Sequence, residues 1–112
     1  MKGTQLGEFE ELVLLAIAIL QDQAYGLAIK HKLHDELNKN ISIGAVHAAC
    51  NRLEDKGFLQ ATWTEATKKR GGKRKKCYQV TLAGQRALEY VRDLRQNMWN
   101  QLPGSSFQIA KD

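Results

Sequence analysis

The chain has 112 residues, of which 43% are hydrophobic and 26% charged, with a net charge of +5. This length predicts a single domain, and the hydrophobic share is too high for a disordered chain. The longest apolar run, residues 12–20, is too short to span a bilayer, which needs about 20 residues. Acidic residues precede that run where a signal peptide would carry cations. Two cysteines do not make a disulfide framework, so we expect a reduced, cytoplasmic protein.

The positive charge is concentrated in residues 68–76, which surround Gly71 and Gly72. Seven of these nine residues are cations: Lys68, Lys69, Arg70, Lys73, Arg74, Lys75 and Lys76. Subtracting them from the net charge of +5 leaves −2 for the rest of the chain. Such a loop suits a polyanion, and duplex DNA carries about two phosphates per 3.4 Å of axis. The alternative is a turn whose lysines only keep it soluble.

Two helices are predicted in the first third of the chain. Residues 6–20 are apolar at helical spacing and have little polar face, which predicts a central helix packed on several sides. Residues 24–37 form the second helix, with Ile29, Leu33 and Leu37 four residues apart.

The third helix is predicted over residues 43–56, between an N-cap at Ser42 and a left-handed C-terminal cap at Gly57. Its inward stripe consists of Val46, Cys50 and Leu53. Its outward face carries Gly44, Ala48, Asn51 and Asp55, with His47 and Arg52 on the flanks.

A β-hairpin and a long helix complete the chain. Residues 58–64 alternate apolar and polar side chains, and residues 77–81 form a second strand, so the basic run is the hairpin tip. Residues 82–102 form a helix whose apolar seam is too narrow for a buried helix, which indicates a twin helix as partner. The expected dimer interface is Leu88, Val91, Leu94, Arg95, Met98, Trp99 and Leu102.

This order predicts a mainly α fold with a small β-hairpin, that is, a winged helix-turn-helix. We expect residues 1–81 to form the DNA-binding domain and residues 82–102 the C-terminal dimerisation helix. Residues 103–112 would be a polar, frayed tail on the same compact unit. The third helix would enter a major groove, with the basic wing (residues 65–76) along the backbone or in a minor groove.

The sequence resembles the PadR family of bacterial and archaeal transcriptional regulators over roughly residues 6–90. The segments that carry the resemblance are residues 6–16 (LGEFEELVLLA), Tyr25-Gly26, Gly44-Ala45-Val46, residues 52–57 (RLEDKG), residues 71–75 (GGKRK) and residues 82–84 (LAG). The resemblance implies a winged-helix homodimer that represses promoters with inverted-repeat operators. In some members a small ligand modulates DNA binding.

We expect DNA contacts from the second and third helices and from the wing cations. The first set is Tyr25, Ser42, Gly44, Ala45, His47, Ala48, Asn51 and Arg52. His47 stands where the family usually has a tyrosine that meets phosphates, and imidazole can also donate a hydrogen bond. The small residues Gly44 and Ala48 allow close approach of the helix backbone, so groove shape would add to base readout.

Other sites are less favoured by the pattern. His31 and His34 share a helix face, but zinc needs a third ligand and none is evident. His47 and Cys50 are one turn apart, yet Cys50 points into the core stripe, so we expect no enzyme and no cofactor. Cys77 follows Lys75 and Lys76, which favour its thiolate; it is either a redox sensor or a small strand residue.

Three functions are compatible with the sequence. The leading one is a dimeric, sequence-specific DNA-binding repressor. An adaptor winged helix that binds proteins would carry an apolar hairpin rather than seven cations. A nonspecific nucleic-acid-binding protein would need a basic face outside the loop. A dimer seam containing Met98 and Trp99 leaves room for a small-molecule effector.

Overall fold

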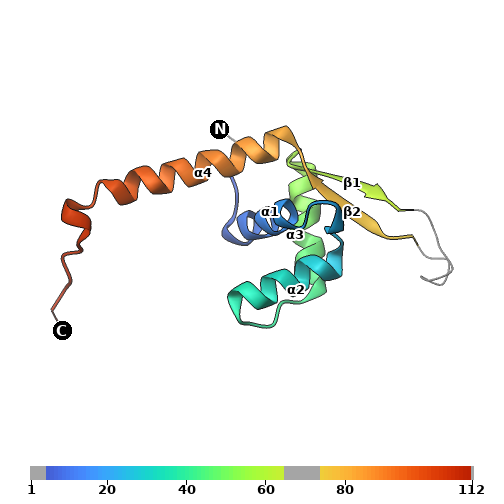
Figure 1. Cartoon of the computed structure of the whole chain (residues 1–112), viewed down its shortest axis with the longest axis horizontal. Helices are drawn as coiled ribbons and strands as arrows, with labels where there is room; N and C mark the ends of the chain where they lie inside the picture. Colours follow the sequence, from blue (N-terminus) through green and yellow to red (C-terminus); the bar gives the residue numbers. More distant parts are fainter. Residues whose placement is uncertain (1–4, 65–73, 112) are drawn as a thin grey trace.

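The computed structural model describes residues 5–64 and 74–111, which confirm the mainly helical fold with one hairpin (Figure 1). No helix within these two segments is both long and apolar enough to cross a membrane. The elements are α1 (Glu8–Leu20), η2 (Gln21–Gln23), α2 (Gly26–Leu37), α3 (Ile43–Asp55), β1 (Leu59–Trp63), β2 (Lys76–Val80), α4 (Leu82–Asn100) and η4 (Pro103–Ser105). The helices and strands therefore lie within about two residues of their predicted bounds.

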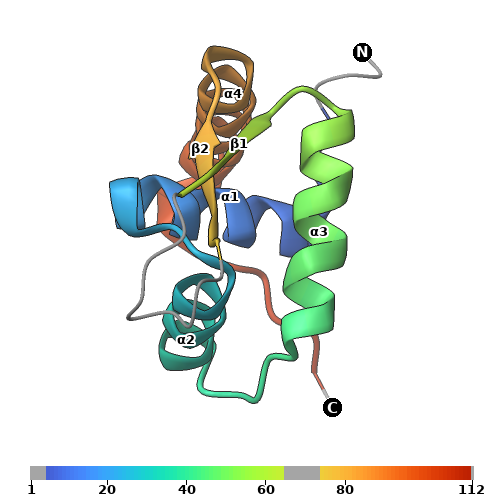
Figure 2. The ribbon, with the colours of Figure 1, turned by 90° about the vertical axis from the view of Figure 1, so that its right-hand side faces the viewer.

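The core lies between α1, α2, α3 and the base of the hairpin, and these elements surround it in Figure 2. The predicted inward stripe of α3 is confirmed, because Val46, Cys50 and Leu53 are 0% exposed. From the other two helices Val13, Leu14, Ile17, Ile29 and Leu33 complete this core. Each buried aliphatic side chain stabilises the fold by about 1.5–3 kcal/mol relative to its exposed state.

Helix α1 packs on several sides, as its sequence predicts, and leaves one apolar face exposed. It contacts α2, α3, β2 and α4, but one of its faces stays open. On that face Leu15 is 40% exposed and Ile19 is 61% exposed. The predicted packing of α1 on several sides is therefore confirmed, and the face that carries Leu15 and Ile19 is not covered by the described elements.

The hairpin is antiparallel and pairs Leu59 with Val80 at its base and Trp63 with Lys76 at its outer end. A third segment joins β2 from the other side, since Tyr78 N–H donates to Ala24 O over 3.0 Å and Tyr25 bridges to Cys77. This extra pairing explains why both Cys77 and Tyr78 are buried, although a simple hairpin alternates buried and exposed positions.

Helix α4 begins in the body and then leaves it. The Thr81 hydroxyl caps its first turn by accepting from Gly84 N–H (3.0 Å) and donates to Gly57 O (2.7 Å). Farther along, Leu94 and Met98 are exposed, and the helix projects away from the core on the side opposite the hairpin (Figure 1). The molecule is consequently elongated, 61 × 32 × 19 Å.

The sequence suggested a frayed tail after α4, but part of this tail packs against the helix. After the turn η4 the chain folds back, and the Phe107 ring meets the Trp99 ring edge-on at 5.8 Å and 89°. Both rings are nevertheless more than half exposed. The tail therefore extends the apolar surface of α4.

Glycine at position 84 is required by the contact between α4 and the turn before β1. A Cβ there would lie 2.3 Å from Phe58 O, which is backbone and cannot move aside. We predict that Gly84→Ala destabilises the protein by about 1–3 kcal/mol, as overpacking does. Gly44→Ala is the matched control, because a Cβ at that helical glycine meets nothing within 4 Å. It should stabilise by up to about 1 kcal/mol. Urea unfolding measures both, and equal effects would contradict the steric argument.

A buried carboxylate, Glu10, ties α1 to α3. The Glu10 side chain is only 6% exposed, and its oxygens accept from Arg52 Nε at 2.9 Å and Lys56 Nζ at 2.7 Å. Gly7 N–H also donates to Glu10 Oε1 at 2.7 Å, and Lys56 Nζ reaches Gln5 O at 2.9 Å. These bonds join the start of α1 to the second half of α3.

The same contacts control the ionisation of Glu10. Burial alone would raise the pKa of this carboxyl, but the hydrogen bonds from Lys56, Gly7 and Arg52 together outweigh it. They lower the pKa from 4.5 to about 2. A carboxyl with a lowered pKa in the folded state stabilises the fold above its unfolded pKa. Its contribution, about 2–3 kcal/mol, should be lost as the pH falls from 4.5 toward 2.

We therefore predict that Glu10→Gln lowers the free energy of unfolding at pH 7 by about 2–3 kcal/mol. The variant should also lose less stability than the wild type between pH 5 and pH 2, because its amide does not titrate. Glu8→Gln, at an exposed position of the same helix turn, should change stability by less than about 0.5 kcal/mol. Urea titrations across this pH range test both variants. Parallel pH profiles for wild type and Glu10→Gln would contradict the account.

Candidate nucleic-acid interface

The outward face of α3 carries small side chains around one amide. Ser42 Oγ accepts from Ala45 N–H at 3.1 Å, which confirms the predicted N-cap and fixes where the helix begins. Beyond it Gly44, Ala48 and Asn51 are exposed. A helix with such small side chains can approach another molecule closely, and the Asn51 side-chain amide can both donate and accept hydrogen bonds.

A groove of about 510 Å³ lies between α3, the start of α2 and the hairpin. Five of the predicted DNA-binding residues line it: Tyr25, His47, Asn51, Lys75 and Lys76. Gly26 allows α2 to approach α3 here, because a Cβ on it would lie 3.0 Å from His47 Nε2. Residues from three separate parts of the sequence thus meet on one concave surface.

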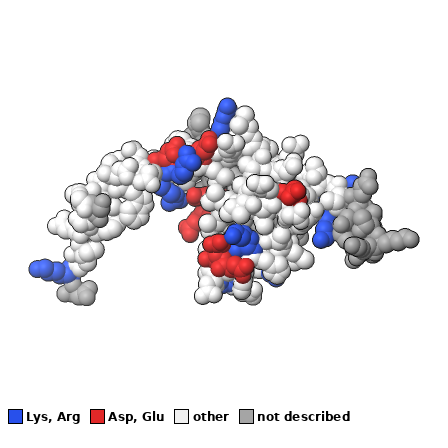
Figure 3. Space-filling view, viewed as in Figure 1, with Lys and Arg blue, Asp and Glu red and all other residues white. Residues whose placement is uncertain are grey.

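The described cations of the hairpin lie over aromatic rings. Lys75 Nζ is 5.0 Å from the centre of the Tyr25 ring, and the Arg74 guanidinium is 5.9 Å from that of Trp63. Arg74 Nε also donates to Thr64 O at 3.3 Å. Both cations are exposed. In the face of the molecule drawn in Figure 3, the charged atoms at the described end of the hairpin belong to Lys and Arg. These contacts hold positive charge beside the groove.

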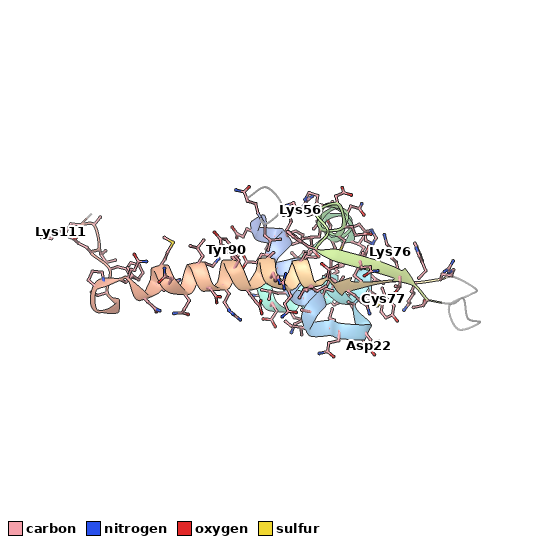
Figure 4. The ribbon with its side chains drawn as sticks, turned by 90° about the horizontal axis from the view of Figure 1, so that it is seen from above. Asp22, Lys56, Lys76, Cys77, Tyr90 and Lys111 are labelled. Atoms are coloured by element: carbon pink, nitrogen blue, oxygen red, sulfur yellow. The ribbon has the colours of Figure 1, made fainter. Side chains whose placement is uncertain are left out.

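Lys76 is placed differently from its neighbours. Its Nζ lies 3.2 Å from a Glu54 carboxylate oxygen on α3 and 5.3 Å from the centre of the Tyr78 ring. Figure 4 shows Lys76 on the side of the hairpin that faces α3, while Cys77 points to the other side with Asp22. Lys76 therefore braces the wing against α3, and Glu54 offsets part of its charge.

The rest of the basic run lies outside the described residues: Lys68, Lys69, Arg70 and Lys73. Their contribution to DNA binding stays a prediction from the sequence.

Six of the described residues that we expected to contact DNA do not line the groove: Ser42, Gly44, Ala45, Ala48, Arg52 and Arg74. Ser42 Oγ already accepts the hydrogen bond that caps α3. Ala45 lies with Arg52 on the flank of α3 that faces α1. Arg52 is held there by Glu10, although its side chain is 53% exposed. Arg52 is thus held on the flank of α3 away from the groove that His47 and Asn51 line, and direct reading of bases is not the role that its position favours.

Trp63 is a groove residue that sequence reasoning missed. It is 55% exposed, lines the groove with Tyr25 and lies under the Arg74 and Lys76 cations. The alternation of apolar and polar residues in this strand predicts that Trp63 points to the same side as Leu59, which is buried. The signal that could have identified it is its position at the outer end of the hairpin, beyond the helices that cover Leu59.

The cysteines occupy structural positions. Burial, assisted by the nearby Glu54 carboxylate, raises the pKa of the Cys50 thiol to about 11. Burial likewise raises the pKa of Tyr78, which contacts Cys50, to about 12. The Cys50 thiol therefore stays protonated at neutral pH and is a poor nucleophile. Cys77 is 7% exposed and its Sγ donates to Asp22 O at 3.5 Å, as expected for a small packed residue.

His31 and His34 are both exposed on α2. Within residues 5–64 and 74–111, no three His, Cys, Asp or Glu side chains gather where they could hold a metal ion.

A second concave surface lies between the start of α1 and the projecting part of α4. This groove of about 950 Å³ is lined by Leu6, Phe9, Tyr90, Leu94 and Met98, with the ion pairs of Glu10 at one edge. Arg95, a predicted interface residue, donates from Nη2 to Glu11 Oε1 of α1 at 3.2 Å. Of the other predicted interface residues, Leu88, Val91 and Leu102 are half-buried and Trp99 is exposed. The apolar seam of α4 is therefore continuous with the α1 region.

Comparison with known proteins points to one family. The model of the transcriptional regulator PadR-like family matches residues 14–90. A PadR-like transcription factor from Bacteroides fragilis superposes with a TM-score of 0.69 at 23% identity, covering 84% of this chain and 85% of that chain. A PadR family regulator from Eggerthella lenta gives 0.64 at 28% identity, covering 83% and 80%. A transcriptional regulator from Clostridium thermocellum gives 0.65 at 20% identity, covering 81% and 85%. No curated protein matches the sequence significantly.

The family match spans well over half of the chain and includes the second half of α1, all of α2, α3 and the hairpin, and about half of α4. The protein belongs to the PadR-like family of transcriptional regulators and is a DNA-binding regulator with a winged helix-turn-helix fold.

Proposed function

We propose that the protein is a repressor that binds an inverted-repeat operator as a homodimer. The observation that carries the proposal is the groove in which Asn51 and His47 of α3 face Tyr25 and Lys75. A hydrogen-bonding helix face beside fixed cations is the arrangement that base readout combined with phosphate binding requires.

In this proposal α3 lies in the major groove. Gly44 and Ala48 let its backbone approach the bases, and Asn51 pairs with a base edge, most favourably adenine N6 and N7. Tyr25 and His47 donate to phosphates beside the groove. Lys75 and Arg74 move off the Tyr25 and Trp63 rings and bind phosphates of the same DNA strand. The remaining wing cations bind phosphates farther along the DNA backbone.

The dimer would form through the seam of α4 together with the open face of α1. The seam contains Leu94, Met98 and Trp99, and α1 adds Leu15 and Ile19, which the sequence did not single out. Exposed apolar surface on this scale is typical of an interface. Residues 1–81 would then be the DNA-binding domain, residues 82–102 the dimerisation helix and residues 103–112 a tail. A two-fold dimer reads a two-fold operator.

An effector would fit best between the two projecting helices, next to Trp99 and Met98. Met and Trp side chains adapt to planar apolar ligands.

Asn51 provides the test of sequence-specific binding. With DNA from the promoter that the protein controls, Asn51→Ala should weaken binding by about 1–3 kcal/mol, and much less on scrambled DNA, because only a base contact carries sequence information. Asn97→Ala, an exposed position on α4, is the matched control and should bind as the wild type does. Gel shifts at physiological salt measure both. Equal losses on the two DNAs would mean that Asn51 contacts the backbone only.

Dimerisation is tested by a charge on the seam. We predict that Met98→Glu makes the protein monomeric at micromolar concentration, because an unpaired carboxylate in an apolar interface costs several kcal/mol. Asn97→Glu adds the same charge one residue earlier, on the polar side of α4, and should leave the dimer intact. Sedimentation velocity distinguishes the two. A dimeric Met98→Glu variant would place the interface elsewhere.

A further inference from the structure

Arg52 and the hairpin lie on opposite flanks of α3. His47 and Glu54 lie on the hairpin flank, where Glu54 meets Lys76, whereas Arg52 and Lys56 lie on the flank that faces α1. Figure 4 shows Lys56 beside α3 on the side away from the hairpin tip. Arg52 is the only cation within the span of α3 itself. A helix seated in a major groove has a phosphate backbone along each flank.

The guanidinium of Arg52 is only partly used by the protein. Glu10 takes its Nε–H at 2.9 Å, and among the described residues the Nη groups donate to no other partner. The side chain is 53% exposed, whereas the carboxylate that holds it is 6% exposed. Because guanidinium has five N–H donors in a planar fork, an Arg held at Nε can still bind a phosphate through its two Nη groups.

Lys56 makes the support rigid. Its Nζ bridges Glu10 Oε1 at 2.7 Å and Gln5 O at 2.9 Å, and its side chain is 30% exposed. Gly7 N–H holds the same Glu10 oxygen at 2.7 Å. Glu10 is therefore fixed by contacts that do not involve Arg52, and it can hold Arg52 in one orientation before DNA arrives.

We propose that Glu10 is a positioning residue for DNA binding: it holds Arg52 on the α1 flank of α3 with its Nη groups presented to a backbone phosphate, across the groove from the hairpin. The inference rests on the proposed function, since it assigns α3 to a major groove. It changes the role of Arg52 from base readout to phosphate contact. A long side chain that is already ordered loses less conformational entropy on binding than a free one.

Glu10→Asp tests the positioning, because it keeps the charge and shortens the side chain by one methylene. We expect Glu10→Asp to weaken binding to specific and random DNA alike, roughly three- to tenfold, since the preorganised orientation is lost. Arg52→Ala should remove one phosphate contact per protomer. The log–log salt slope of the dimer should then become shallower by about 2, and affinity at physiological salt should fall roughly ten- to thirtyfold.

The double variant separates positioning from mere folding. If Glu10 acts through Arg52, Glu10→Asp in the Arg52→Ala background should have no further effect on affinity, although it still lowers the melting temperature. Arg92→Ala, an exposed arginine on α4 that is also paired with a carboxylate, is the matched control and should leave the slope unchanged. An unchanged slope in Arg52→Ala, or additive losses in the double variant, would overturn the proposal.

Failure of the proposed function would look different. In that case the wild type itself would show no preference for promoter DNA over scrambled DNA, whatever the variants do. Should Glu10→Asp fail to fold, Arg52→Ala still tests the phosphate contact, because Glu10 keeps its bonds to Lys56 and Gly7.

Discussion

The arrangement of this molecule depends on one buried carboxylate that joins its first helix to its third. Glu10 accepts from Arg52 and Lys56 of α3 and from Gly7 at the start of α1, with donor–acceptor distances of 2.7–2.9 Å. Apolar packing holds α3 against α1, but the hydrophobic effect that drives it is non-directional. Directed ion pairs select one orientation, and this orientation turns Gly44, Ala48 and Asn51 outward.

Helix α1 consequently contacts both of the helices to which we assign a partner. Through Glu10 it supports the helix that we assign to DNA, and through Glu11 it contacts Arg95 of the projecting α4. The hairpin and α4 extend from the body in opposite directions along the long axis (Figure 1). Helix α1 is thus the element that contacts both the helix that we assign to DNA and the helix of the proposed dimer seam.

Much of this fold could be predicted from local sequence. Ser42, the stripe of Val46 and Leu53, and the positive φ of Gly57 fix α3 within a turn of chain, so its bounds followed from its own residues. Long-range pairings were beyond that reasoning. Glu10 and Arg52 are 42 residues apart, and nothing local marks them as partners. The exposure of Trp63 and of Leu15 likewise depends on how far the neighbouring helices extend over them, which the local sequence does not specify.

The account is tested most directly by the two tryptophans, since Trp63 lies in the proposed DNA groove and Trp99 on the proposed dimer seam. With excitation that is selective for tryptophan, Trp63 is the only emitter in a Trp99→Phe variant, and Trp99 is the only emitter in a Trp63→Phe variant. Titration with operator DNA should quench or shift the emission of Trp63 and leave that of Trp99 nearly unchanged. Dilution through the dimer dissociation range should do the reverse. If the emission of Trp63 stays unchanged at saturating DNA while gel shifts show binding, the assignment of DNA to this groove is contradicted.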